Sequence, residues 1–301
     1  MELQRGQVAV VTGGGSDIGL ALAERFATAG LNIVAADVQD DALEAAATSI
    51  AAHGVEVHTV RCDVSKEEQV AALVQATLDR FGGVHVVCNN AGVAAQADPW
   101  FGPLSAWEWV MGVNFWGVVH GCRAFLPHLI GGGHIVNTAS IAGLYPGFSP
   151  GYDASKHAVV AISEGLHNMV TMAGLPVGVS VLCPGWVRTQ IMDADRNWPD
   201  ELGDKPEPPP LSEIVGQHVR RAIAEGATPA YIADAVADSV MANRFWVIPQ
   251  QDFLDLCVRR WDSIAERANP SRTEQTPGMP PPEQLLEELM KGLGVEPPTS
   301  E

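Results

Sequence analysis

Short apolar runs alternate along this chain with longer stretches in which apolar residues recur at helical spacing. Most of these runs are rich in apolar residues, and glycine or polar residues bound most of them. Runs of this kind are typical of parallel strands that are covered on both faces. The pattern predicts seven strands, at residues 8–12, 32–36, 55–61, 84–88, 134–138, 177–182 and 245–248.

Helical stretches between successive strands predict one α/β domain, a Rossmann-type doubly wound parallel sheet of seven strands with helices on both faces. A chain of 301 residues that is 47% hydrophobic can bury one substantial core without division. We expect the main domain at residues 1–268, with a variable lid at 186–228 that selects a ligand. A proline-rich tail with one short amphipathic helix follows at residues 269–301.

The tail has two interpretations. In the first it is a mobile appendage. In the second its apolar residues dock on a neighbouring subunit; these residues are Leu285, Leu286, Leu289 and Met290.

The formal net charge of −18 disfavours nucleic acid and anionic membranes as partners, because either would approach against a repulsive field. No run of lysine or arginine reverses that field. The first apolar stretch, residues 8–11, is too short for a signal peptide or a membrane span. These features predict a cytoplasmic protein that binds a small molecule, with no nucleic-acid or membrane partner.

The five cysteines form no Cys-x-x-Cys pair, and the nine histidines lack the spacing of a metalloprotease site. The cysteines lie mostly in apolar strand or helix contexts. We therefore expect buried free thiols and no metal site.

A glycine-rich turn, TGGGSDIG at residues 12–19, joins the first predicted strand to an amphipathic helix. Glycines there let backbone amides approach a pyrophosphate at the helix N-terminus, where the helix dipole favours negative charge. The second strand leads into Asp37, whose carboxylate can accept hydrogen bonds from both hydroxyls of an adenosine ribose. A 2′-phosphate would meet this charge, and no arginine stands at Val38 to offset it. The sequence therefore predicts NAD rather than NADP.

A tyrosine and a lysine four residues apart, Tyr152 and Lys156, would project from one face of a helix. The ammonium would lower the pKa of the phenol from its reference value of about 10, so that Tyr152 becomes a general acid or base near neutral pH. Ser140 follows the strand predicted at 134–138 and adds a hydroxyl that could hold a carbonyl or alcohol oxygen. The three side chains indicate proton transfer to or from a C–OH/C=O pair.

Taken in order, these segments resemble the motifs of the classical short-chain dehydrogenase/reductase family, from about residue 6 to about residue 270. The turn at 12–19, CDV at 62–64, NNAG at 89–92 and PGWVRT at 184–189 are each similar to a family segment that contacts the cofactor. The resemblance implies a homodimer or homotetramer. It also implies a catalytic set in which Asn114 supports the lysine through water; the set is Asn114, Ser140, Tyr152 and Lys156.

The cofactor-binding residues follow from the turn, from the end of the second strand and from this resemblance. They are Gly13, Ser16, Asp17, Ile18, Gly19, Asp37, Asp63, Val64, Asn90, Ala91, Gly92, Tyr152, Lys156, Pro184, Gly185, Val187 and Thr189.

Two features depart from the family pattern. Asp17 stands where the family's turn has its second glycine, and it places a carboxylate near the pyrophosphate. If this side chain caps the helix amides, NAD binding survives, and if it points at the phosphates, NAD affinity falls. The spacing from Ser140 to Tyr152 is one residue shorter than is usual in the family, so the loop between them must turn more tightly.

The sequence as a whole predicts an NAD-binding catalytic domain that transfers hydride between the nicotinamide and a hydrophobic secondary alcohol or ketone, with Tyr152 as general acid/base. A non-catalytic dinucleotide-binding regulator, and an epimerase or dehydratase that recycles its cofactor, stay open as alternatives. Apolar residues near the site favour a hydrophobic substrate. They are Ile141, Leu144, Tyr145, Phe148, Trp186, Met192 and Trp198.

Overall fold

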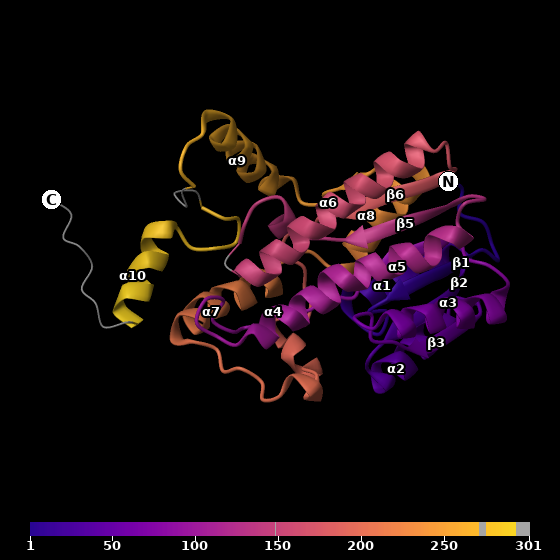
Figure 1. Cartoon of the computed structure of the whole chain (residues 1–301), viewed down its shortest axis with the longest axis horizontal. Helices are drawn as coiled ribbons and strands as arrows, with labels where there is room; N and C mark the ends of the chain where they lie inside the picture. The colour runs from indigo at the N-terminus through magenta and orange to yellow at the C-terminus, as the bar shows by residue number, and fades with distance from the viewer. Residues whose placement is uncertain (148, 271–274, 293–301) are drawn as a thin grey trace.

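The computed structural model describes residues 1–147, 149–270 and 275–292. At its centre lies a seven-stranded parallel sheet in the order β3-β2-β1-β4-β5-β6-β7 (Figure 1). The strands are β1 (Val8–Thr12), β2 (Asn32–Asp37), β3 (Val57–Arg61), β4 (Val86–Asn89), β5 (Gly133–Thr138), β6 (Val177–Leu182) and β7 (Trp246–Val247). The prediction of a seven-stranded, doubly wound sheet is confirmed.

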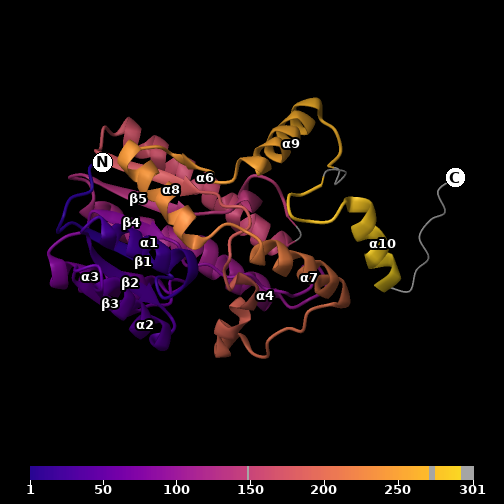
Figure 2. The same ribbon diagram turned by 180° about the vertical axis from the view of Figure 1, so that it is seen from behind.

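Alternate residues of a strand point to opposite faces of a sheet, and both faces of this sheet are covered. Ala9 and Val11 pack on the face of α1, α2 and α8, whereas Val8 and Val10 pack on the face of α3, α5 and α6. Figures 1 and 2 show these two helical layers from opposite sides. The helices are α1 (Asp17–Thr28), α2 (Asp40–Ala51), α3 (Glu67–Phe81), α5 (Gly117–Phe125), α6 (Pro150–Met172) and α8 (Pro229–Ala242).

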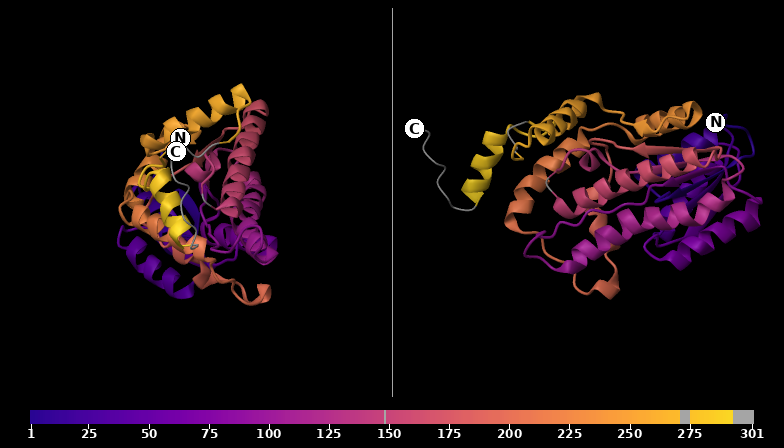
Figure 3. Two further views of the ribbon diagram at one scale, coloured as in Figure 1. Left: turned by 90° about the vertical axis from the view of Figure 1, so that its left-hand side faces the viewer. Right: turned by 45° about the horizontal axis from the view of Figure 1, so that its top comes forward.

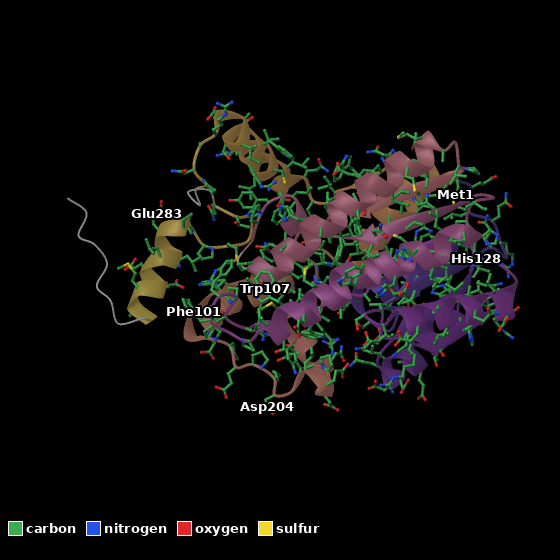
Figure 4. All side chains as sticks on the ribbon, viewed as in Figure 1. Met1, Phe101, Trp107, His128, Asp204 and Glu283 are labelled. Carbon is green, nitrogen blue, oxygen red and sulfur yellow. The ribbon has the colours of Figure 1, made fainter. Side chains whose placement is uncertain are left out.

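Other elements extend the molecule beyond the carboxyl ends of the strands. The lid and the tail lie at this end, away from the N-terminus (Figure 3, right). In Figure 4, Phe101, Asp204 and Glu283 lie there, opposite Met1 and His128. The remaining elements are α4 (Leu104–Met111), the π-helix η1 (Gly112–Trp116), η2 (Leu126–His128), η3 (Ile141–Gly143), η4 (Ile191–Asn197), η5 (Asp200–Leu202), α7 (Pro210–Ala224), η6 (Gln251–Phe253), α9 (Leu254–Glu266) and α10 (Pro282–Gly292).

The parallel strands place their carboxyl ends at one edge, so the segments that follow them meet there. Gly13 follows β1, Asn90 follows β4, and Ser140 and Pro184 come shortly after β5 and β6. The Nδ2 atom of Asn90 donates to the carbonyl of Thr12 at 3.1 Å, which ties the ends of β1 and β4 together. The strand order reverses between these two strands, and ligands of such sheets bind at this reversal.

Two sequence expectations about composition can be compared with the structure. All five cysteines are free thiols, and four of them, Cys62, Cys88, Cys183 and Cys257, are buried. Burial raises the pKa of each of these four thiols, which keeps them protonated at neutral pH. Within residues 1–147, 149–270 and 275–292, no helix has the length and apolar character that a membrane crossing requires.

Candidate active site

A cavity of about 1230 Å³ opens at the carboxyl edge of the sheet. Its walls come from the segments after β1, β2, β4, β5 and β6, from α7 in the lid, and from the tail. The volume exceeds the roughly 300–1,000 Å³ of an ordinary small-molecule site. The cavity is therefore large enough for a dinucleotide and a second molecule side by side.

Three of the four predicted catalytic residues meet at one wall of this cavity, and they are Ser140, Tyr152 and Lys156. A hydrogen bond joins the Ser140 and Tyr152 side chains, although they lie on different elements. The Nζ atom of Lys156 lies 5.5 Å from the centroid of the Tyr152 ring and donates to the carbonyl of Thr138 at 2.9 Å. The helical spacing of Tyr152 and Lys156 thus brings both groups to the end of β5.

The protonation of this pair is set by burial. The Tyr152 ring faces the cavity but is surrounded by its walls, and this burial raises the pKa of the phenol to about 12, although the bond from Ser140 opposes the shift. Burial also lowers the pKa of the Lys156 ammonium to about 8. The predicted lowering of the phenol pKa is wrong for this structure, because desolvation is the largest cause of the shift and it raises the pKa.

Asn114 lies behind the cavity wall, fully buried in the π-helix η1. Its Oδ1 atom accepts from the Val93 amide at 2.8 Å, and its Nδ2 atom donates to Val93 O and to Ser155 Oγ, both at 3.0 Å. A Cβ atom built on Gly92 would lie 3.4 Å from both Asn114 Oδ1 and Lys156 Nζ, so the two polar groups face the same glycine. Single π-turns of this kind are frequent at functional sites.

The glycine turn and Asp37 form the opposite end of the cavity. A Cβ atom on Gly19 would lie 1.8 Å from the Gly13 carbonyl, so only glycine lets α1 begin this close to the turn. The Asp37 carboxylate accepts from the backbone amides of Gly15, Val38 and Gln39 at 3.1, 2.8 and 3.2 Å. The carboxylate is therefore fixed at the cavity wall, with capacity for further donors.

The side chain of Asp17 bonds to the lid and not to the amides of α1. Its Oδ2 atom accepts from the backbone amide of Gln190 at 2.9 Å. Its φ of +51° is a left-handed conformation that favours the glycine expected there. Burial is the largest cause of the raised pKa of this carboxyl. The residue thus connects the turn to the lid beside the predicted pyrophosphate site.

The other predicted cofactor residues all line the same cavity, although they come from four separate segments of the chain. They are Gly13, Ser16, Ile18, Gly19, Asp63, Val64, Asn90, Ala91, Gly92, Pro184, Gly185, Val187 and Thr189.

Five of the seven predicted substrate residues line the cavity, and they are Ile141, Tyr145, Trp186, Met192 and Trp198. Leu144 instead packs against the core cluster that contains Val118 and Val159. Its side chain therefore contributes to the core and not to the cavity lining. Phe148 lies outside the described residues.

Several residues at this end of the cavity were not predicted. Val215, Val219 and Ile223 line it from α7, and their spacing of four residues is a signal that could have identified them. No local sequence pattern identifies the other lining residues, because they belong to segments that are distant in the sequence. They are Gln96, whose Nε2 atom donates to Met192 O, Trp109, which contacts Trp198 edge to face, and Phe253, Thr276 and Leu285.

Comparison with known proteins gives four findings. The sequence profile described as short chain dehydrogenase matches residues 7–200. The chain is 42% identical over 198 residues to a 1-deoxy-11-beta-hydroxypentalenate dehydrogenase from Streptomyces exfoliatus, which covers 64% of this chain and 71% of the relative. It is 36% identical over 238 residues to a 2-(R)-hydroxypropyl-CoM dehydrogenase from Xanthobacter autotrophicus, which covers 76% of this chain and 89% of the relative. A short chain dehydrogenase/reductase from Burkholderia phymatum, solved in complex with NAD, matches with a TM-score of 0.88 and 39% identity over 92% of this chain and 100% of that chain.

Proposed function

The chain belongs to the short chain dehydrogenase family, and we propose that it is an NAD-dependent oxidoreductase that interconverts a hydrophobic secondary alcohol and its ketone. The observation that carries the proposal is the convergence of Ser140, Tyr152 and Lys156 on a cavity that also contains the glycine turn. The side chains of Ser140, Tyr152 and Lys156 on one wall can transfer a proton, and the glycine turn on the other wall suits the pyrophosphate of a dinucleotide.

Each polar group at the first wall has a role in proton transfer. Ser140 and Tyr152 hold the substrate oxygen, because their bonded hydroxyls face the cavity together. Tyr152 accepts the hydroxyl proton when an alcohol is oxidised and donates its own proton when a ketone is reduced. Lys156, largely charged at neutral pH, stabilises the phenolate electrostatically. NAD, when bound, accepts or supplies the hydride.

The preference for NAD over NADP rests on the charges around the second wall. The Asp37 carboxylate is fixed where a ribose would lie, and it favours hydroxyl donors over a 2′-phosphate. Arg61 lines the same end of the cavity, but its Nη1 atom pairs with Asp40 at 3.1 Å. Its charge is thereby partly offset, which supports selection against the phosphate.

The proposed substrate class follows from the apolar lining beyond Tyr152. Ile141, Trp186, Met192 and Trp198 supply most of the lining predicted from sequence, and α7 adds further aliphatic side chains. Such a surface favours an apolar secondary alcohol, alicyclic or aromatic, over an anionic sugar. The names of the Streptomyces and Xanthobacter relatives both describe dehydrogenases of hydroxyl-bearing compounds, which supports a reaction at a CH–OH group.

A turnover screen tests the proposed function. The purified protein is given NAD and a panel of cyclic and aromatic secondary alcohols, and NADH absorbance is followed. We expect NADH formation with apolar alcohols and little with sugar alcohols. NADH binding without turnover of any alcohol or ketone would support the regulator instead.

The pKa of Tyr152 predicts different pH dependences for alcohol oxidation and ketone reduction. Alcohol oxidation needs the phenolate, and a raised pKa makes this form scarce at neutral pH. We expect kcat/KM for oxidation to rise about tenfold per pH unit until about pH 8, where Lys156 loses its proton and the rise weakens. Ketone reduction uses the protonated phenol and should stay nearly constant over the same range. Oxidation that does not change with pH would contradict this assignment of the base.

Replacement of Asp17 tests the effect of its charge on cofactor affinity. We expect Asp17→Asn to lower the Kd of NADH about tenfold, or about 1.4 kcal/mol, because it removes a negative charge beside the pyrophosphate. Its side-chain carbonyl can still accept from Gln190. Asp17→Gly should tighten binding in the same direction while it also relieves the positive φ. Titration by energy transfer from tryptophan to NADH measures both, and unchanged constants would show that the charge does not reach the phosphates.

A further inference from the structure

The tail of the chain docks on the lid of the same chain. The helix α10 lies against α7, and both views of the molecule show the two side by side (Figures 1 and 2). The indole Nε1 atom of Trp186 donates to Pro277 O at 2.6 Å, and His218 Nε2 lies 2.6 Å from Glu288 Oε2. The bond to His218 lowers the pKa of the Glu288 carboxyl. We call residues 275–292 the tail strap.

Burial within the tail strap is one-sided. Met279 and Leu285 are 4% and 7% exposed, whereas Leu286, the next residue of α10, is 54% exposed. Only one face of the helix therefore packs against the domain. Neither sequence interpretation of the tail anticipated this contact within the chain. The side chain of Leu289 lies outside the described residues.

A glycine permits the closest approach of the tail strap to the domain. Gly278 has a φ of +75°, and a Cβ atom there would lie 3.1 Å from Trp186 Cδ1 and 3.3 Å from Ala222 Cβ. Trp186 in turn contacts Phe253 edge to face, with 6.4 Å between ring centroids. The tail strap is therefore packed directly on the indole that lines the cavity.

The tail strap also reaches the cavity itself. Thr276 and Leu285 line it, together with Val215 and Val219 of α7 and Trp186. None of these belongs to the residues that carry the proton-transfer or dinucleotide roles. Leu285, Val215, Val219 and Trp186 give this part of the cavity an apolar wall, which favours burial of an apolar part of the ligand.

We propose that the tail strap is part of the substrate-binding site, where Leu285 and Trp186 form an apolar subsite for the part of the substrate distant from the reacting carbon. This proposal rests on the proposed function, because it assumes that a ketone or alcohol occupies this end of the cavity. The subsite takes the second ring of a fused alicyclic substrate. A single-ring substrate does not need it.

Two point variants and two matched controls test the tail strap. Leu285→Ala shortens the cavity-lining side chain, and Gly278→Ala strains the backbone and presses on Trp186. Leu286→Ala makes the same truncation on the exposed face of α10. Gly82→Ala imposes the same strain, at a φ of +75°, where a Cβ atom meets nothing within 4 Å.

The readout is ligand binding to the NADH-loaded full chain by calorimetry, so that it does not depend on turnover. The probes are decalone, an apolar bicyclic ketone, and cyclohexanone. We expect both test variants to raise the Kd of decalone at least about tenfold. The two control variants should bind decalone as the wild-type chain does. The Kd of cyclohexanone and the Kd of NADH should stay unchanged in all four variants. The proposal is overturned if the wild-type chain does not bind decalone, or if the test variants bind it as well as the controls do. Turnover is measured separately, and decalone that binds at the tail strap without being reduced would refute the proposed function alone.

Discussion

Replacement of Tyr152 by phenylalanine is expected to lower kcat by about 10²- to 10⁴-fold while NADH binding stays within about twofold of the wild type. The substitution removes the one group that moves the substrate proton and keeps the ring that faces the cavity. Lys156 remains in the variant, but its ammonium donates to Thr138 O and is not placed to replace the phenol. Steady-state turnover and an NADH titration on the same preparation measure the two effects.

The control for this variant is Tyr231→Phe. Tyr231 lies on α8, is 51% exposed, and donates its hydroxyl to Pro249 O at 3.0 Å away from the cavity lining. The same loss of a hydroxyl should leave kcat unchanged there. Wild-type turnover by Tyr152→Phe would remove Tyr152 from the mechanism and would leave the cavity without its proposed acid/base.

Replacement of Asp37 by serine is expected to reduce the discrimination between NADH and NADPH by about a hundredfold, or about 2.7 kcal/mol. The substitution removes the carboxylate that accepts from three backbone amides and that would accept from the ribose hydroxyls. We therefore expect NADH binding to weaken. The like-charge contact with the 2′-phosphate disappears, so NADPH binding strengthens. Parallel titrations with the two cofactors measure the ratio of the two dissociation constants.

The matched control is Asp41→Ser, at an exposed aspartate in the first turn of α2 that lies outside the cavity lining. It changes the net charge by the same amount, so it corrects for the general field of this acidic chain. A ratio that falls equally in both variants would show that selectivity comes from net charge and not from the position of Asp37.

The fold could be predicted from the sequence because most strands are short apolar runs and the connections between them have helical periodicity. The strand ends were less predictable, since pairing sets them. The predicted strand at 245–248 shortens to Trp246 and Val247 because β7 is an edge strand that pairs only with Val181 and Leu182 of β6. Residues 55 and 56 fall outside β3 because the pairing between β3 and β2 begins at Val57 and Ile33.

Part of the candidate site could be predicted from the topology of the sheet. Gly13, Asn90 and Pro184 follow strand ends, and a parallel sheet brings strand ends together. Contacts between distant segments could not be predicted, such as that of Asp17 with Gln190 or that of Trp186 with the tail strap, because no local pattern indicates them. The sequence also missed the direction of the Tyr152 pKa shift, because residue spacing indicates the neighbouring charge but not the depth of burial.

Transfer of deuterium from labelled NADH to an apolar ketone tests directly whether this chain is a hydride-transferring oxidoreductase. We expect each turnover to place one deuterium on the carbinol carbon of the product alcohol and to consume one NADH. With Tyr152→Phe the transfer should be slower by about 10²- to 10⁴-fold. A substrate that is converted while the label and the NADH are retained would contradict net hydride transfer and identify an enzyme that recycles its cofactor.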